Sequence, residues 1–91
     1  MVTGIVLVNV ERQKITEAID SLMGIQGVSE VYTVAGEYDL VVMIRVKSNA
    51  ELSVSVATRM THDIPGIGRS RTLVTLDAKS RIDLPKVFGL A

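Results

Sequence analysis

The chain has 91 residues, 47% of them hydrophobic, and its ten basic residues balance its ten acidic ones. This length allows one hydrophobic core, and a net charge of zero gives no attraction to nucleic acid or anionic lipid. The lack of cysteine excludes disulfides and thiolate metal sites, and His62 alone cannot form a metal site. We therefore expect one cytoplasmic domain without a metal, a cofactor, direct nucleic-acid binding or a membrane segment.

The N-terminal third predicts a strand followed by a helix. Residues 3–10 are rich in β-branched side chains, which favour a strand. Apolar residues then recur at spacings of three and four, which places them on one stripe of a helix: Ile15, Ala18, Ile19, Leu22 and Met23. Gly24 and Gly27 are expected to end this helix.

The next segment predicts an antiparallel hairpin. Residues 28–35 and 39–46 are typical of two strands, and a tight connection at GEY (residues 36–38) joins them. Gly36 is expected to adopt a positive φ in this connection, because that conformation favours glycine. A glycine there also exposes backbone amides to anything that approaches the turn.

A second helix and a fourth strand complete the pattern. Ser48 and Glu51 have the spacing of a capping box, and apolar residues follow at near-helical intervals: Leu52, Val56, Met60 and Ile64. This pattern predicts a helix of about four turns. The helix is expected to depend on packing against a sheet, because it contains residues of weak helix propensity: Val54, Ser55, Val56 and Thr58. Residues 68–76 then predict a strand.

The order β-α-β-β-α-β predicts an α+β fold. We expect a ferredoxin-like sandwich, in which a four-stranded antiparallel sheet carries both helices on one face. The sequences IQGV (residues 25–28) and IPGI (residues 64–67) occupy the same helix-to-strand corner in the two halves, which indicates two similar βαβ units. We place this domain over residues 1–78.

The predicted strands are apolar on both sides, so the sheet face without helices requires a cover. Strict alternation is interrupted by Val31, Tyr32, Val34, Val41, Val42, Met43 and Ile44. A sheet buried on both faces implies a partner sheet or chain, and we expect self-association. Residues 79–91 lack a clear period and are expected to form a loose tail or an arm over a neighbouring subunit. The apolar Val87, Phe88 and Leu90 favour the arm.

The sequence offers little for catalysis. It contains no cysteine and no Gly-x-Ser-x-Gly nucleophile motif. His62 lies beside Asp63 near the end of the second predicted helix, where an imidazolium interacts favourably with the helix C-terminus, so a structural role is favoured. We expect no catalytic residues.

Arg69 and Arg71 alternate along the last predicted strand, so both should project from one face. The residues between and beside them, Gly68, Ser70 and Thr72, should face the other way. The two arginines are either solvated edge charges or contacts to a carboxylate of another subunit or of a ligand.

Asp39 interrupts an otherwise apolar strand entrance. A partly buried carboxylate requires a cation or hydrogen-bond donors to offset its desolvation. Spacing alone leaves two alternatives. The side chain bonds backbone amides of its own turn, as Asx residues commonly do, or it contacts a ligand.

Two motifs carry a family resemblance. GEYDLVV (residues 36–42) and IPGIGRSRTLVTL (residues 64–76) resemble, in this order and with similar separations, the C-terminal ligand-binding and oligomerisation domain of the Lrp/AsnC transcription regulators. The likeness spans residues 5–76. Regulators of this family carry an N-terminal helix-turn-helix domain, whereas this chain starts directly with the first strand, so we expect a stand-alone form of the domain.

The resemblance implies a dimer formed through sheet-face packing, assembly of dimers into rings such as octamers, and an amino-acid effector bound between dimers. It also implies the pocket residues: Gly36, Tyr38, Asp39 and Leu40 on the turn, with Ser70 and Thr72 on the neighbouring strand. Asp39 would pair with the α-ammonium group, Tyr38 would wall the side-chain pocket, and the two hydroxyls and backbone amides near Gly36 would hold the α-carboxylate.

The predicted function is therefore a sensor and assembly module. Amino-acid binding would stabilise one oligomer over another and act on regulation through assembly with itself or with full-length relatives. Two alternatives stay open: a purely structural assembly domain, and a small dimeric enzyme of the ferredoxin-like fold.

Overall fold

The computed structural model describes residues 1–79 and 81, and its elements follow the predicted β-α-β-β-α-β order. The strands are β1 (Val2–Val10), β2 (Val28–Thr33), β3 (Leu40–Val46) and β4 (Ile67–Val74). The helical segments are the 3-10 turn η1 (Arg12–Lys14), the α-helices α1 (Ile15–Met23) and α2 (Asn49–Val54), and the π-helical segment η2 (Ser55–Met60). Apart from positions 79 and 81, the tail predicted over residues 79–91, with Val87, Phe88 and Leu90, lies outside the described residues.

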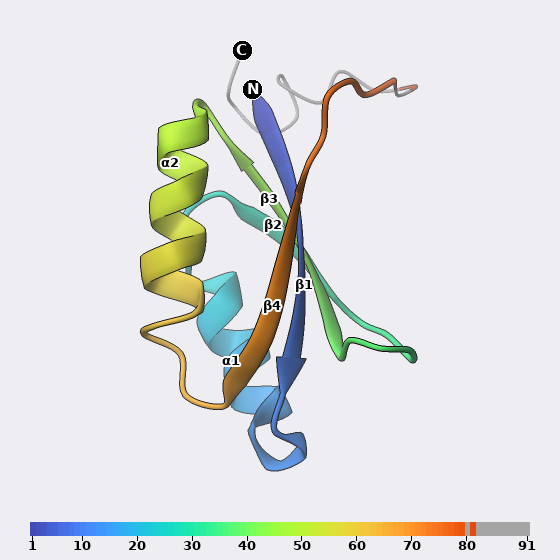
Figure 1. Cartoon of the computed structure of the whole chain (residues 1–91), viewed down its shortest axis with the longest axis vertical. Coiled ribbons are helices and arrows are strands. Elements are labelled where there is room, and N and C mark those ends of the chain that lie inside the picture. Colours follow the sequence, from blue (N-terminus) through green and yellow to red (C-terminus); the bar gives the residue numbers. More distant parts are fainter. Residues whose placement is uncertain (80, 82–91) are drawn as a thin grey trace.

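The strands form one four-stranded antiparallel sheet in the order β2-β3-β1-β4. Both α-helices cover the same face of this sheet, as Figure 1 shows, and among the described residues no helix or strand covers the other. We call this second face the open face. The predicted ferredoxin-like α+β class is confirmed.

Period-two alternation along β1 and β3 builds the core, because every second side chain of these strands points at the helices. The side chains with no exposed surface are Val6, Val8, Ala18, Leu22, Leu40, Val42, Ile44 and Met60. The predicted stripe of α1 is confirmed at Ala18 and Leu22. It is wrong at Met23, which is 47% exposed because it follows Leu22 directly and is rotated by about 100° around the helix axis.

The second helix begins as predicted. The Ser48 Oγ accepts a hydrogen bond from the Glu51 N–H at 3.2 Å, and the Glu51 carboxylate accepts from the Lys47 N–H at 3.1 Å. The prediction of a regular α-helix is wrong after Val54, where η2 continues with π-helical turns. The apolar spacing of four residues exceeds the roughly 3.6 residues of an α-turn. The wider turns keep four side chains on the core: Leu52, Val56, Met60 and Ile64.

The hairpin connection is longer than the predicted tight turn at residues 36–38. β2 ends at Thr33 and β3 begins at Leu40, so six residues separate the strands. The Val34 N–H donates to the Asp39 carbonyl at 3.0 Å, and the loop that this bond closes holds residues 35–38. β4 also ends two residues earlier than predicted, at Val74 rather than Leu76.

The two helix-to-strand corners confirm the internal similarity of the halves. Gly27 and Gly66 occupy equivalent positions with φ angles of 97° and 91°, in a region that favours glycine. A Cβ on Gly27 would lie 2.9 Å from the Val46 Cγ1 and 3.0 Å from the Arg45 carbonyl. Gly24, in contrast, has a φ of −79°, and its nearest neighbour would be 3.4 Å away.

We expect Gly27→Ala to lower the free energy of unfolding by about 1–3 kcal/mol, because it adds backbone strain and a contact with backbone that cannot move away. Gly24→Ala is the matched control and should change stability by less than about 0.5 kcal/mol. Urea unfolding at one fixed protein concentration measures both. Equal losses in the two variants would contradict the constraint at Gly27.

Candidate functional site

Asp39 joins the hairpin connection to the central strand β1. Its Oδ2 accepts hydrogen bonds from the Val10 N–H at 2.8 Å and from the Asn9 side-chain amide at 3.4 Å. Its own N–H donates to the Val8 carbonyl at 3.0 Å. The carboxylate therefore bonds a backbone amide, as one alternative expected, but the amide belongs to β1 and not to the turn itself.

Asn9 and Arg69 surround the connection. The sequence pattern does not single out Asn9, and it leaves open whether Arg69 is a solvated edge charge or a contact to a carboxylate. The Asn9 amide donates to the Glu37 carbonyl at 2.9 Å, and the Arg69 Nε donates to the Asn9 Oδ1 at 3.0 Å. Arg69 also donates to the Glu37 carbonyl at 3.3 Å and lies over the Tyr38 ring, 4.8 Å from its centroid. We call Asn9, Glu37, Tyr38, Asp39 and Arg69 the hairpin cluster.

Gly36 lies at the tip of the connection with a φ of 157°, and a Cβ there would meet nothing within 4 Å. The backbone around this position is therefore open to an approaching group. Leu40, the next predicted pocket residue along the chain, has no exposed surface and belongs to the core. Its buried side chain anchors the C-terminal end of the connection to the core.

Ser70 and Thr72 lie apart from the hairpin cluster. They pair with Val8 and Val6, whose side chains face the helices, so the two hydroxyls belong to the helix-bearing side of β4. The hairpin cluster instead lies at one end of the open face. Asn9 lies between Val8 and Val10, whose side chains face the helices, so its own side chain points to the open face. One chain thus brings Tyr38 and Asp39 together but not the two hydroxyls. A pocket that contains both sets requires residues from two copies.

The surface of the described chain is hollowed near both ends of β3. A shallow hollow of about 370 Å³ adjoins the hairpin cluster and is lined by Asn9, Val10, Glu11, Gly66, Ile67 and Gly68. Its lining residues come from the end of β1 and from the second sequence motif. A groove of about 870 Å³ lies at the opposite end of β3, between α2 and the start of β2, where Arg45, Lys47, Glu51 and Arg59 line it.

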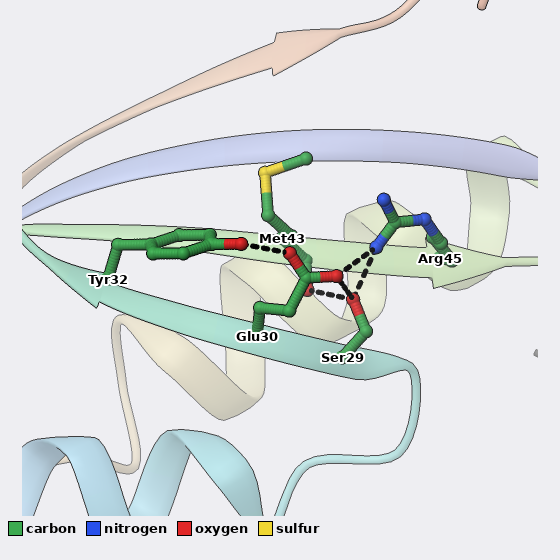
Figure 2. Close-up of polar contacts among 5 residues, drawn as sticks. All are labelled: Ser29, Glu30, Tyr32, Met43 and Arg45. Atoms are coloured by element: carbon green, nitrogen blue, oxygen red, sulfur yellow. Dashed lines mark hydrogen bonds and ion pairs between the residues drawn. The ribbon is translucent and has the colours of Figure 1, made fainter. Parts of the chain in front are cut away.

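A second polar cluster lies on the open face at the β2 edge (Figure 2). A bulge between Val28 and Glu30 shifts the register of β2 against β3. The Tyr32 hydroxyl donates to the Glu30 carboxylate at 2.6 Å, and the Arg45 guanidinium binds the same carboxylate at 3.2 Å. Arg45 also donates to the Ser29 hydroxyl. We call Ser29, Glu30, Tyr32 and Arg45 the β2-edge cluster.

These contacts shift the pKa values of two groups in the β2-edge cluster. The hydrogen bond from Tyr32 and, to a smaller extent, the nearby Arg45 charge lower the pKa of Glu30 against the opposing effect of desolvation. The same hydrogen bond raises the pKa of Tyr32. Glu30 is therefore held as a carboxylate and Tyr32 as a neutral hydroxyl at neutral pH.

The other candidate groups of the sequence have simple environments. His62 is exposed and its Nδ1 lies 3.2 Å from the Asp63 carboxylate. Across residues 1–79 and 81, no group of three or more His, Cys, Asp or Glu side chains lies together in a way that would hold a metal ion. In the same part of the chain, no helix combines the length and apolarity that crossing a bilayer requires.

Comparisons with known proteins identify a family for this chain. Residues 3–83 match the family of Lrp/AsnC ligand binding domains. The HTH-type transcriptional regulator FL11 of Pyrococcus abyssi is 32% identical over 81 residues, which cover 88% of this chain and 52% of FL11. The chain thus spans about half the length of this curated relative.

Two solved structures have a fold similar to that of this chain. TTHA0845 from Thermus thermophilus has a TM-score of 0.82 and 31% identity, with 89% of this chain and 100% of that chain covered. The feast or famine regulatory protein Rv3291c from M. tuberculosis, complexed with L-methionine, has a TM-score of 0.71 and 24% identity, with 93% and 58% covered. The second likeness concerns the fold alone.

We expect Glu30→Gln to lower the free energy of unfolding by about 0.5–1 kcal/mol near neutral pH, because it weakens a partly exposed ion pair. The folded-state pKa of Glu30 lies below its ordinary value of 4.5, so the charge stabilises the fold above that pH. The contribution is lost as the pH falls through the folded-state value. The difference in the free energy of unfolding between wild type and Glu30→Gln should therefore become smaller in acid.

Thermal unfolding between about pH 7 and pH 3 measures this narrowing. Glu17→Gln is the control, since Glu17 forms only an exposed pair with Lys14 at 3.8 Å. A difference between wild type and Glu30→Gln that stays constant over the whole range would contradict the stabilising role of the Glu30 charge.

Proposed function

Because this chain belongs to the Lrp/AsnC ligand-binding domain family, we propose that it is a sensor of free amino acids that assembles with itself. The assembly is a homodimer that forms higher oligomers of the octamer type. The observation that carries the proposal is the hairpin cluster, in which Asn9 holds Asp39 and Arg69 at one end of the open face.

The hairpin cluster has the groups that a zwitterion requires. The Asp39 carboxylate pairs with the α-ammonium group, and the remaining guanidinium donors of Arg69 pair with the α-carboxylate. Backbone amides beside the unobstructed Gly36 add donors to the carboxylate, and the Tyr38 ring lines the space for the ligand side chain. The adjoining hollow of about 370 Å³ gives the ligand room at this end of the sheet.

The pocket is completed by a second copy of the chain. Ser70 and Thr72 contribute hydroxyls from the helix-bearing side of β4, which faces away from the hairpin cluster of the same chain. Leu40 supports the turn from the core and positions Asp39. A ligand bridged between copies in this way stabilises the oligomer that contains the complete pocket, by about 2.7 kcal/mol at a hundredfold excess over its Kd.

The dimer forms through the open face. The half-buried apolar side chains at the centre of this face are Ile5, Leu7, Val41 and Met43. A second sheet packed on them, at the usual distance of about 10 Å, removes this surface from water. This arrangement supplies the partner that strands apolar on both sides require.

The proposed role in regulation is indirect. FL11 is named as a transcriptional regulator, and this chain covers about half of it. We assign the chain the effector-dependent part of such a system, acting by assembly with itself or with full-length members of the family. Rv3291c was solved with L-methionine, which supports an amino acid as the class of ligand.

A structural assembly domain without a ligand is the second candidate. One observation favours it: the Asp39 carboxylate already accepts hydrogen bonds from Val10 and Asn9, so its charge is compensated without a ligand. On this alternative the hairpin cluster only fixes the turn against β1, and the oligomer is insensitive to amino acids.

Native mass spectrometry with each of the twenty amino acids separates the two candidates. We expect one or a few amino acids at millimolar concentration to bind wild type, shift its distribution of oligomers and raise its Tm. Asp39→Asn should abolish the response, and Asp20→Asn, an exposed helix residue, should keep it. The sensor proposal fails if wild type ignores all twenty, and the structural alternative then stands.

The open-face dimer has its own test. We expect Val41→Lys to raise the dimer Kd by about a hundredfold or more, because a charge is placed at the centre of an apolar interface. Val54→Lys is the matched control, since Val54 is 54% exposed on α2. Sedimentation equilibrium measures both values. A dimer that tolerates Val41→Lys as well as Val54→Lys would exclude the open face as the interface.

A further inference from the structure

The groove of about 870 Å³ lies at the end of β3 that is remote from the proposed effector site. One wall is the corner that leads from α1 into β2, at residues 26–29, and the other is one stripe of α2 and η2. The corner is held in place, because the Gly27 carbonyl accepts a hydrogen bond from the Arg45 N–H at 2.7 Å. A volume of this size lies within the range of pockets that bind small molecules.

The lining of the groove combines an aliphatic surface with positive charge. Its apolar side chains are Val28, Val46, Ala50 and Val54, and its charged side chains are Arg45, Lys47, Arg59 and Glu51. Three cations therefore line the groove together with one carboxylate. None of the described residues that line it is aromatic, so a nucleobase would find no ring on which to stack. This combination favours an anion with an aliphatic body.

The three cations of the groove differ in their contacts. The Arg45 guanidinium is 10% exposed and binds the Glu30 carboxylate at 3.2 Å, as Figure 2 shows. Lys47 and Arg59 are exposed, and their side chains make no ion pair or hydrogen bond with residues 1–79 and 81. These two cations can therefore pair with an anion without giving up a contact inside the described chain.

Ser55 adds a buried donor to the same wall. Its side chain is only 6% exposed and lines the groove, yet its hydroxyl makes no hydrogen bond within the part of the chain that the structure describes. A buried hydroxyl without a partner is costly, and an acceptor in the groove would remove this cost. Arg59 follows Ser55 by four residues, so the two side chains lie on neighbouring turns of one helical face.

The charges of the groove do not suit a zwitterion. An amino acid requires a carboxylate for its α-ammonium group as well as donors for its α-carboxylate. The one carboxylate of the groove, Glu51, already accepts the Lys47 N–H at 3.1 Å and so closes the first turn of α2. The groups that are left to bind a ligand are the donors of Lys47, Ser55 and Arg59.

We propose that this groove is a second binding site, for a small organic anion with an aliphatic body. The head group is a carboxylate or a phosphate, which pairs with Arg59 and accepts a hydrogen bond from Ser55. Lys47 adds positive charge along the groove, and the aliphatic body lies against Val28 and Val54. The site goes beyond the proposed effector site, because it lies at the other end of β3 and takes a different class of ligand.

Titration of the full chain with sodium octanoate, followed by NMR of the backbone amides, tests the site. We expect saturable shifts at residues 26–29 and 45–59. Octanol, which lacks the charge, and acetate, which lacks the chain, should bind at least about tenfold more weakly. Octyl phosphate distinguishes the two head groups, since the tighter of the two probes identifies the preferred one. Shifts that are absent from the groove, or confined to the open face, would overturn the proposal.

The contribution of the cation is measured with Arg59→Ala. This substitution should raise the Kd of octanoate about tenfold or more, because it removes a charge-assisted contact. Arg71→Ala is the matched control, since Arg71 is an exposed arginine on β4 outside the groove. Isothermal titration calorimetry measures both values. Equal losses of affinity in the two variants would show attraction by surface charge alone and overturn the site.

Ser55→Ala separates a ligand contact from a structural role. The substitution removes a hydroxyl without a partner and introduces a residue of higher helix propensity, so the free energy of unfolding should stay the same or rise. The Kd of octanoate should nevertheless rise about threefold or more, because the ligand loses a hydrogen bond. A variant that loses stability and keeps its affinity for octanoate would contradict the assigned contact.

The outcomes also separate this inference from the proposed function. Octanoate binding reports on the groove, whereas native mass spectrometry of wild type with the twenty amino acids reports on the effector site. A protein that binds octanoate in the groove and ignores every amino acid keeps the second site and loses the sensor. A protein that responds to an amino acid and shows no shifts in the groove keeps the sensor and loses the second site.

Discussion

The structure depends on one constraint: the helices cover one face of a sheet whose central strands are apolar on both faces. On β1 and β3 the buried helix-facing side chains have almost no exposed surface, whereas most of their neighbours on the open face are only half-buried. Because side chains alternate along a strand, a one-residue shift of register would exchange the two sets. The core therefore fixes the register, and the register decides which residues the open face presents.

Each of the two sheet irregularities lies next to a polar cluster. One register shift separates Val28 from Glu30 beside the β2-edge cluster, and the other separates Val8 from Val10 beside the hairpin cluster. Bulges bend a strand locally and re-aim its side chains. Here they allow polar groups to satisfy one another at the margins: Asn9 links Asp39 to Arg69 at one end. The centre of the open face is left to apolar residues, which a second sheet can cover without burying an unpaired charge.

The sequence predicts the fold well because most of its signals are local. The alternation of the strands, the spacing of Leu22 from Ala18, and the glycines at residues 27 and 66 each act within a few residues of chain. The π-helical turns of η2 do not follow from weak helix propensity, which indicates only that the helix depends on packing. The apolar spacing of four residues in that helix was the signal that could have revealed them.

The candidate site was less predictable, because it depends on register. Asp39 and Tyr38 could be singled out from their place in the sequence, whereas Asn9 and Arg69 enter the cluster only because β1 lies between β3 and β4. The same register puts Ser70 on the other side of the sheet from Asn9. A pattern along one chain carries no information on how residues from two copies combine.

The two arginines on β4 place the proposed effector site next to the open face. Arg69 and Arg71 are two residues apart on one face of this strand, so the first belongs to the proposed effector site and the second to the margin of the open face. A ligand carboxylate that pairs with the guanidinium donors of Arg69 left free by Asn9 and the Glu37 carbonyl adds negative charge beside this margin. The affinity of the ligand then differs between monomer and dimer. By linkage, the dimer must respond to the ligand by the same factor. A sheet edge shared in this way would transmit effector binding to the proposed assembly without any large rearrangement of the fold.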